Sequence, residues 1–278
     1  MGKALRPSRL AAVAIALAAV SGSGIVGPAA IAAESPLGDQ AGAWPIAWQP
    51  YLLGNGFLVM DPIGDVGCGS GYCDVSSGGP GTLSSVYWAS DGANLFMRLR
   101  VLGDPTNAAA GGFRSTAYVL AIGVGGVQVA AVGLDGKPAN RDFVYVANAD
   151  GTAYSEIYAY PFDGSGGQQS SAARAQPDGS GHYFVDWQVP IARITQRTAG
   201  VVTGATPIQL FFGTSQAANL SVINKDYMTG NSVDFGDSST IILVPPLPGT
   251  PPVTSTPGAP ASPPGGGGLP ILPNTAMR

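Results

Sequence analysis

The sequence contains little of what most enzymes and nucleotide-binding proteins require. In 278 residues it has one histidine, His182, two cysteines, and only 11% charged residues. A zinc site needs more histidine or cysteine ligands than this, and no glycine-rich phosphate-binding motif follows a strand and opens a helix. A G-x-S-x-G nucleophile elbow is also missing, because residues 213–217 read GTSQA. We therefore predict no catalytic residues and a protein that is not an enzyme.

The one strictly apolar run of any length lies near the N-terminus. Three basic residues precede residues 10–20, which carry only small and aliphatic side chains, and Ala30-Ile31-Ala32 supplies a small-x-small cleavage site. This arrangement is typical of a secretory signal peptide. The run is shorter than the ~20 residues that a membrane-spanning helix needs. We expect a cleaved leader, residues 1–33, and a secreted bacterial protein with no membrane attachment after cleavage.

Positive charge is scarce in the remaining chain. Removal of the leader leaves 10 of the 13 basic residues against 17 acidic ones, a net charge of −7. Such a balance disfavours nucleic acid and anionic lipid as partners, and we expect neither.

The C-terminal residues, 245–278, are dominated by proline and glycine and contain almost nothing to bury. Such a segment cannot offset its ordering entropy, so we predict a disordered tail. The stretch LPNTA, residues 272–276, resembles the sorting signals of Gram-positive surface proteins. Those signals are followed by a membrane span and a basic tail, whereas only Met277 and Arg278 follow here. Whether the motif is accidental or the reading frame has lost its end stays open, and so does cell-wall attachment, which no membrane-spanning tail supports.

Between leader and tail, residues 34–244 have the pattern of one large all-β domain. Apolar residues alternate or form short runs bounded by Gly, Asp, Asn and Pro. The predicted strands are residues 51–60, 84–90, 94–101, 116–124, 127–134, 142–147, 153–160, 182–189, 207–214 and 239–244. Hairpin turns are expected at Asp91-Gly92, Gly125-Gly126, Asp135-Gly136 and Asp150-Gly151, where positive φ favours glycine. We predict an antiparallel two-sheet β-sandwich, jelly-roll or immunoglobulin-like, with one helical turn at 190–194.

The alternation within single strands predicts which faces are buried. In the strand at 94–101 one face carries Leu95, Met97, Leu99 and Val101, and the other carries Phe96, Arg98 and Arg100. This predicts a sheet with one buried and one solvated side. Residues 117–124 and 208–213 lack alternation and are expected to be buried on both faces.

An acidic, glycine-rich loop at 61–74 is the candidate metal site. Asp61, Asp65 and Asp74 supply carboxylates in a flexible segment, and calcium favours such oxygen ligands. The spacing does not match an EF-hand. The alternative, that these are ordinary turn residues, stays open.

The two cysteines, Cys68 and Cys73, lie within this loop. In an exported chain such a pair favours a disulfide over a reactive dithiol. A bridge here would clamp the loop and bring Asp74 back toward the other carboxylates.

Four tryptophans are candidates for sugar stacking, because aromatic faces pack on sugar rings. Trp187 and Trp88 alternate with valines and are expected to be core. Trp44 and Trp48 lie in an apolar stretch after the leader, where they either cap the sandwich or form an exposed platform for a ligand. They are the candidate ligand-binding residues.

Three stretches resemble a known family. YWASDGANLFMRLRVLGDP (87–105), HYFVDWQVPIARI (182–194), and QLFFGTS followed by INKDYMTG (209–230) are similar to signature strands of family 9 carbohydrate-binding modules and the related DOMON-type domains. In this resemblance Asp186 takes the acidic position and Pro190 the proline. It covers roughly residues 61–235. It implies a secreted sandwich with structural calcium and glycan binding in some members.

Three functions follow as hypotheses. The first is a non-catalytic extracellular module that binds carbohydrate or a cell-wall component and is stabilised by calcium. The second is a structural or surface protein whose sandwich mediates protein contacts. The third is a secreted hydrolase of unrecognised type, with two carboxylates facing across a cleft. The sequence indicates no oligomeric state.

Overall fold

The structure is a computed structural model of the chain. It describes residues 44–45, 47–65, 68–77, 84–107, 111–161, 172–229 and 233–243. The predicted leader, residues 1–33, and the predicted tail, residues 245–278, lie outside the described residues.

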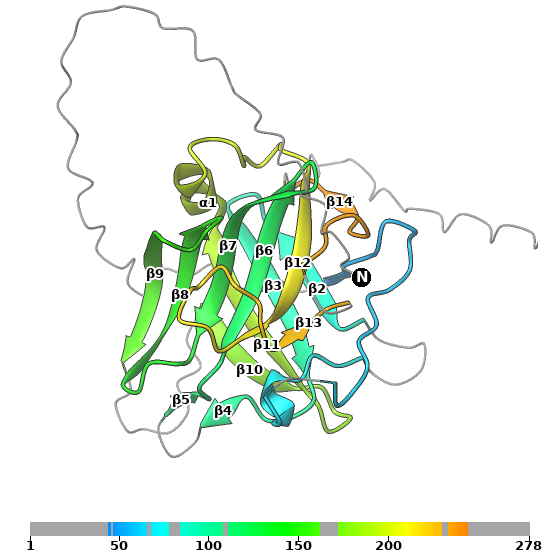
Figure 1. Ribbon diagram of the computed structural model, residues 1–278, viewed down its shortest axis with the longest axis vertical. Coiled ribbons are helices and arrows are strands. Elements are labelled where there is room, and N and C mark those ends of the chain that lie inside the picture. Colours follow the sequence, from blue (N-terminus) through cyan, green and yellow to red (C-terminus); the bar gives the residue numbers. More distant parts are fainter. Residues whose placement is uncertain are drawn as a thin grey trace, which may run out of the picture. The chain divides into compact units, whose positions relative to one another are not determined.

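The described chain is an antiparallel β-sandwich, as the alternation of apolar residues predicted (Figure 1). Its elements are β1 (Gln49–Pro50), a 3-10 turn η1 (Gly71–Cys73), β2 (Val86–Ser90), β3 (Asn94–Val101), β4 (Thr106–Asn107), β5 (Gly112–Phe113), β6 (Ala117–Val124), β7 (Val127–Asp135), β8 (Arg141–Asn148), β9 (Tyr154–Pro161), β10 (Ala173–Pro177), β11 (Tyr183–Pro190), α1 (Ile191–Arg197), β12 (Ile208–Ser215), β13 (Asp226–Tyr227) and β14 (Thr240–Ile241). One sheet has the order β1-β2-β3-β11-β10, and the second has the order β13-β12-β6-β7-β8-β9 with β14 beside β12. The short β4 and β5 pair separately.

The core lies between the two sheets. Trp187 of β11 is fully buried and meets Phe212 of β12 edge-on, with ring centroids 6.3 Å apart. Tyr51 also packs against Phe212, with ring centroids 6.2 Å apart. Trp187 is therefore core, as predicted, and Trp88 is partly buried against the same cluster.

Several strand predictions differ from the structure. Residues 51–60 were predicted as a strand, but they form only isolated bridges, because Gly54-Asn55-Gly56 folds back and Leu53 N–H donates to the Phe57 carbonyl. The strand expected at 239–244 shortens to β14. The edge strand β10 was missed, because its inward residues are only alanines, Ala173 and Ala175. The helical turn expected at 190–194 extends to Arg197.

The outer face of the five-stranded sheet is less solvated than predicted. Leu95, Met97, Leu99 and Val101 fill the core as expected, but Phe96 and Arg100 on the opposite face are also buried. Trp44 packs against Phe96 with ring centroids 6.3 Å apart, so the segment before β1 covers this face. The predicted wet side was wrong for these residues.

A second apolar layer covers the outer face of the seven-stranded sheet. Phe211 of β12 points there and meets the rings of Tyr227 and Phe235, each at 6.3 Å. An added Cβ at Gly123 would lie 2.8 Å from the Phe235 ring, and one at Gly213 would lie 2.5 Å from Ile223. These glycines make room for the segment that follows β12. The prediction of strands buried on both faces holds for β6 and β12.

Glycine serves two different purposes at the four predicted turns. Gly92, Gly125, Gly126 and Gly151 adopt positive φ, as predicted. Gly136 does not, and the reason for glycine there is space, because an added Cβ would lie 2.6 Å from the Arg114 carbonyl oxygen.

Candidate functional site

Four aspartates meet at one end of the sandwich. Asp61, Asp65 and Asp74, the three residues predicted from the sequence, are joined by Asp226 of β13. One oxygen from each carboxylate lies within 4.8 Å of the others. The cluster therefore connects the loop at 61–74 with the edge of the seven-stranded sheet.

Three of the four carboxylates are withdrawn from water. Asp61 and Asp74 are 2% exposed and Asp226 is 4% exposed, whereas Asp65 lies at the surface. Oδ2 of Asp61 and Oδ1 of Asp74 are buried without a hydrogen-bond partner among the described residues. Buried polar atoms are nearly always satisfied in proteins. Buried carboxylate oxygens without a hydrogen-bond partner, in a cluster of this kind, are typical of a site that binds a cation.

Local structure fixes the direction of each buried carboxylate. The main chain of Asp61 is tied at both ends, because its N–H donates to Ser85 Oγ at 3.2 Å and its carbonyl accepts Ser77 Oγ–H at 3.1 Å. Asp74 directly follows η1, and its Oδ2 accepts the Gly64 N–H at 2.9 Å.

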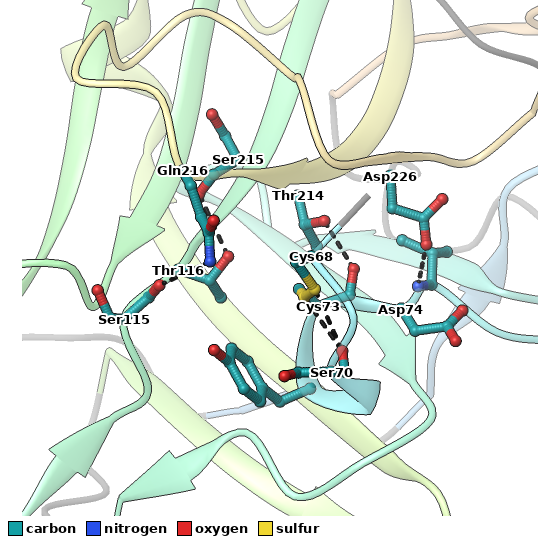
Figure 2. The surroundings of a disulfide bond; sticks show 12 residues. Cys68, Ser70, Cys73, Asp74, Ser115, Thr116, Thr214, Ser215, Gln216 and Asp226 are labelled. Atoms are coloured by element: carbon teal, nitrogen blue, oxygen red, sulfur yellow. Dashed lines mark hydrogen bonds between the residues drawn. A yellow bond between two sulfur atoms is a disulfide. The ribbon is translucent and has the colours of Figure 1, made fainter. Parts of the chain in front are cut away.

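Asp226 joins two distant parts of the chain. Its Oδ2 accepts the Val75 N–H at 2.5 Å, and its Oδ1 accepts the Tyr227 N–H at 2.8 Å. Figure 2 shows Asp74 and Asp226 side by side at the end of the loop that carries the disulfide. Residues 151 positions apart are thus held together by a hydrogen bond that a bound cation would reinforce.

The electrostatics of the cluster are those of a site that lacks positive charge. Burial, followed by repulsion from Asp226, Asp65 and Asp74, raises the pKa of Asp61 to about 9. Burial and the charges of Asp65 and Asp74 raise the pKa of Asp226 to about 7, against two backbone hydrogen bonds that lower it. Burial also raises the pKa of Asp74. Full ionisation of the four groups is therefore unfavourable until a cation offsets it.

The donor set fits a hard divalent cation. All four ligands are carboxylates, and binding through one or both oxygens of each matches the roughly six to eight oxygens that calcium takes. Magnesium, by contrast, keeps several waters and is seldom held by an all-protein cage. No sulfur or imidazole ligand belongs to the cluster, which disfavours zinc.

A disulfide shapes the loop that supplies Asp74. Cys68 and Cys73 are bonded, with Cα atoms 6.6 Å apart. Around the bridge, Thr214 Oγ1–H donates to the Cys73 carbonyl at 2.7 Å (Figure 2). The Tyr118 O–H donates to the Tyr72 carbonyl at 2.9 Å. The bridge and these bonds hold the loop against the ends of β6 and β12.

Replacement of Cys68 and Cys73 by serine is expected to loosen this loop without unfolding the domain. A disulfide that closes so short a loop contributes about 2 kcal/mol or less, and most of the buried core lies elsewhere. We expect weaker calcium binding with a small change in melting temperature, measured by calorimetry on both proteins. Unchanged calcium affinity in the serine variant would show that the bridge does not shape the site.

Asp226 was not predicted as a ligand from the sequence, because no neighbouring residue marks it as one. It lies in INKDYMTG, far from the acidic loop, among fifteen aspartates. Its role depends on the pairing of β13 with Gly213 and Thr214 of β12, which places residue 226 at the cluster. Only the strand topology brings the two segments together.

Trp44 and Trp48 form a second group, on the outer face of the five-stranded sheet. The guanidinium of Arg174 lies over the Trp44 ring at 4.3 Å, and that of Arg98 lies over the Trp48 ring at 4.2 Å. Both arginines bind Asp186, at 2.8 and 2.7 Å. Each ring is half-buried, so the structure gives neither a fully exposed platform nor a fully buried cap.

The single histidine belongs to a buried polar network. Its Nδ1 lies 2.9 Å from Ser76 Oγ, but Ser76 is fully buried and out of reach of a substrate. Asp178 accepts the backbone N–H of His182 at 3.1 Å rather than a ring proton. Asp178 instead pairs with the guanidinium of Arg100. The arrangement is not that of a Ser-His-Asp triad, in which the acid holds the imidazole.

No protein-family model and no curated protein matches the chain. The resemblance to family 9 carbohydrate-binding modules and DOMON-type domains therefore stays a prediction. Within the part of the chain that the structure describes, no helix has the length and apolar character needed to cross a membrane.

Proposed function

We propose that this chain is a secreted bacterial, non-catalytic binding module whose sandwich is stabilised by calcium and which binds carbohydrate or a cell-wall component. The observation that carries the ligand part is the aromatic outer face of the five-stranded sheet. Trp44, Trp48, Tyr87 and Phe184 are each half-buried there. The calcium part rests on the four-aspartate cluster.

Aromatic rings of this kind suit sugar recognition because they present a flat apolar surface at low entropic cost. Phe184 meets Tyr87 edge-on at 5.9 Å, and Arg98 lies between the Phe184 and Trp48 rings. The Arg98 guanidinium in turn donates to Asp186 and, at 3.4 Å, to Gln176. The rings are therefore held in place before a ligand arrives, which lowers the cost of binding.

The charges beneath the rings also bear on the class of ligand. Both guanidinium groups bind the same fully buried carboxylate and lie over the Trp rings, so part of their charge is offset and they support the rings. The flat rings are what this surface offers to a ligand, and they suit a neutral sugar that stacks on them.

Affinity electrophoresis in soluble polysaccharides and cell-wall preparations tests the proposal. Stacking on one or two rings corresponds to a Kd between the micromolar and millimolar ranges, roughly −8 to −4 kcal/mol. The wild-type protein is expected to be retarded, and Trp44→Ala or Trp48→Ala to abolish the retardation without hydrolysis of the polysaccharide.

Phe57→Ala is the matched control, because this ring is 69% exposed but lies on a different loop. It should leave the retardation unchanged. Melting temperatures of all three variants separate the loss of a ligand contact from the loss of the fold. If no preparation retards the wild-type protein, the binding-module proposal fails and the protein-contact alternative replaces it.

A further inference from the structure

The segment that follows β12 covers the outer face of the seven-stranded sheet. We call residues 216–229 the cover segment; it passes in front of β6, β7 and β8 in Figure 1. Leu220 and Ile223 in this segment are buried, and the Leu220 carbonyl accepts the hydroxyl proton of Tyr145, which lies on β8, at 2.7 Å. The cover segment thus shields apolar strand residues that would otherwise meet water.

The cover segment has little regular structure near the cluster. Only two of its residues, Asp226 and Tyr227, form a strand, and this strand pairs with two residues of β12. Beside them, the Met228 N–H donates to the Phe212 carbonyl at 2.9 Å, and the Lys225 N–H donates to the Thr214 carbonyl at 3.1 Å. So short a ladder is weak by itself, and small changes in free energy can open such a segment.

The same two-residue strand supplies one of the four clustered carboxylates. The other three belong to residues 61–74, on a separate segment of the chain. The charged groups that act on Asp61 are Asp226, Asp65 and Asp74, all of them acids. Without a cation the four acids cannot all be ionised together and nothing joins the two segments through them, whereas with a cation both segments bind one centre.

We infer that cation binding at the four-aspartate cluster controls the closure of the cover segment over the seven-stranded sheet. The inference rests on the proposed calcium site and adds a conformational consequence to it. A cation that binds the closed arrangement better than the open one shifts the population toward closure. Removal of the cation then exposes Phe211 and Tyr145, which are buried beneath the cover segment.

Hydrogen–deuterium exchange of the mature protein, with calcium and with chelator, measures this closure directly. We expect the amides of Lys225 and Met228 to lose protection by about tenfold on chelation, within the usual range of coupling between sites. Amides of β3 and β11, which pair across eight residues in the other sheet, should keep their protection. Calorimetric titration with calcium on the same samples reports binding independently.

Coupling is reciprocal, so a change in the cover segment must alter calcium affinity. Ile223→Ala removes an apolar contact of the cover segment with β12 and leaves all four carboxylates in place. It is expected to weaken calcium binding several-fold. Val222→Ala, at the adjacent and 37% exposed position, is the matched control and should leave the affinity unchanged.

The outcomes separate this inference from the calcium site itself. If calcium binds but neither the exchange at residues 225–228 nor the affinity of Ile223→Ala changes, the inference is wrong and the site stands. If calcium does not bind, both are wrong. Loss of protection throughout both sheets on chelation would mean global unfolding and would also contradict local control of the cover segment.

Discussion

Removal of calcium is expected to lower the melting temperature of the mature protein by about 5 to 10 °C. A ligand present at about 100 times its Kd stabilises the native state by about 2.7 kcal/mol. For a domain of this size, each kcal/mol corresponds to about 2–4 °C. The physical reason is the cluster itself. Three of its carboxylates are buried, and the charges that act on Asp61 all come from other acids.

The experiment compares melting curves with calcium and with chelator at matched ionic strength. Asp74→Asn and Asp226→Asn remove one charge each and should abolish the difference between the two curves. Asp74→Asn should also raise the melting temperature of the calcium-free protein, since it relieves repulsion between acids and keeps an acceptor for the Gly64 N–H. Asp91→Asn alters an exposed aspartate outside the cluster and should behave as the wild type does. Identical wild-type curves with and without chelator would count against the site.

Loss of charge at Asp178 is expected to destabilise the protein by about 3 kcal/mol or more. The Arg100 side chain is fully buried and pairs with the Asp178 carboxylate, whose side chain is 1% exposed. Breaking a buried ion pair from one side leaves an uncompensated charge and typically costs about 3–5 kcal/mol. Asp178→Asn keeps an acceptor for the N–H groups of Ser180 and His182 but leaves the guanidinium without a counter-charge.

The pH dependence of this loss follows from the pKa of Asp178. Burial alone would raise it, but hydrogen bonds from Ser180 and Arg100 outweigh burial and lower the pKa to about 2. A carboxyl group whose folded pKa is lowered contributes stability above its unfolded pKa and loses it as pH falls through the folded value. The gap between wild type and Asp178→Asn should therefore be full at pH 7 and close as pH falls from about 4 toward 2.

Two variants control this measurement, which is made by chemical denaturation. Arg100→Met combined with Asp178→Asn removes both charges and should recover part of the lost stability. Glu156→Gln breaks the surface pair with Arg141, whose side chain is 39% exposed, and should cost at most about 1 kcal/mol. Equal losses in Asp178→Asn and Glu156→Gln would contradict the importance of burial.

Much of the sandwich could be predicted from local pattern, because each long strand carries its own signal. Alternation in β3 and continuous apolar runs in β6 and β12 located these strands within two residues. The edge strand β10 gave no such signal, since alanines at its inward positions are small and common outside strands as well. Residues 51–60 were misassigned because three successive turn-forming residues, Gly54 to Gly56, outweighed the apolar content around them.

What covers the sheets could not be predicted from local pattern. The burial of Phe96 depends on Trp44, and the burial of Phe211 depends on Tyr227 and Phe235. These contacts join positions far apart in the chain, so alternation alone assigned the wrong environment to Phe96 and Arg100. The need for glycine at positions 123 and 213 is explained only by the side chains of Phe235 and Ile223, which lie against them.

The candidate metal site was predictable to the extent that it is local. Asp61, Asp65 and Asp74 lie within fourteen residues, in a loop closed by Cys68 and Cys73, and oxygen-rich loops of this kind are a sequence signal. Asp226 is not local. It reaches the site through strand pairing and through the hydrogen bond to Val75. With Asp226, the cluster links the loop at 61–74 to β13 of the seven-stranded sheet.

Calorimetric titration of the metal-free protein with calcium tests the central claim most directly. The account predicts one calcium ion per chain in the wild type and no measurable binding in Asp226→Asn, with Asp91→Asn indistinguishable from the wild type. No heat of binding in the wild type, or binding in Asp226→Asn as tight as in the wild type, would contradict it.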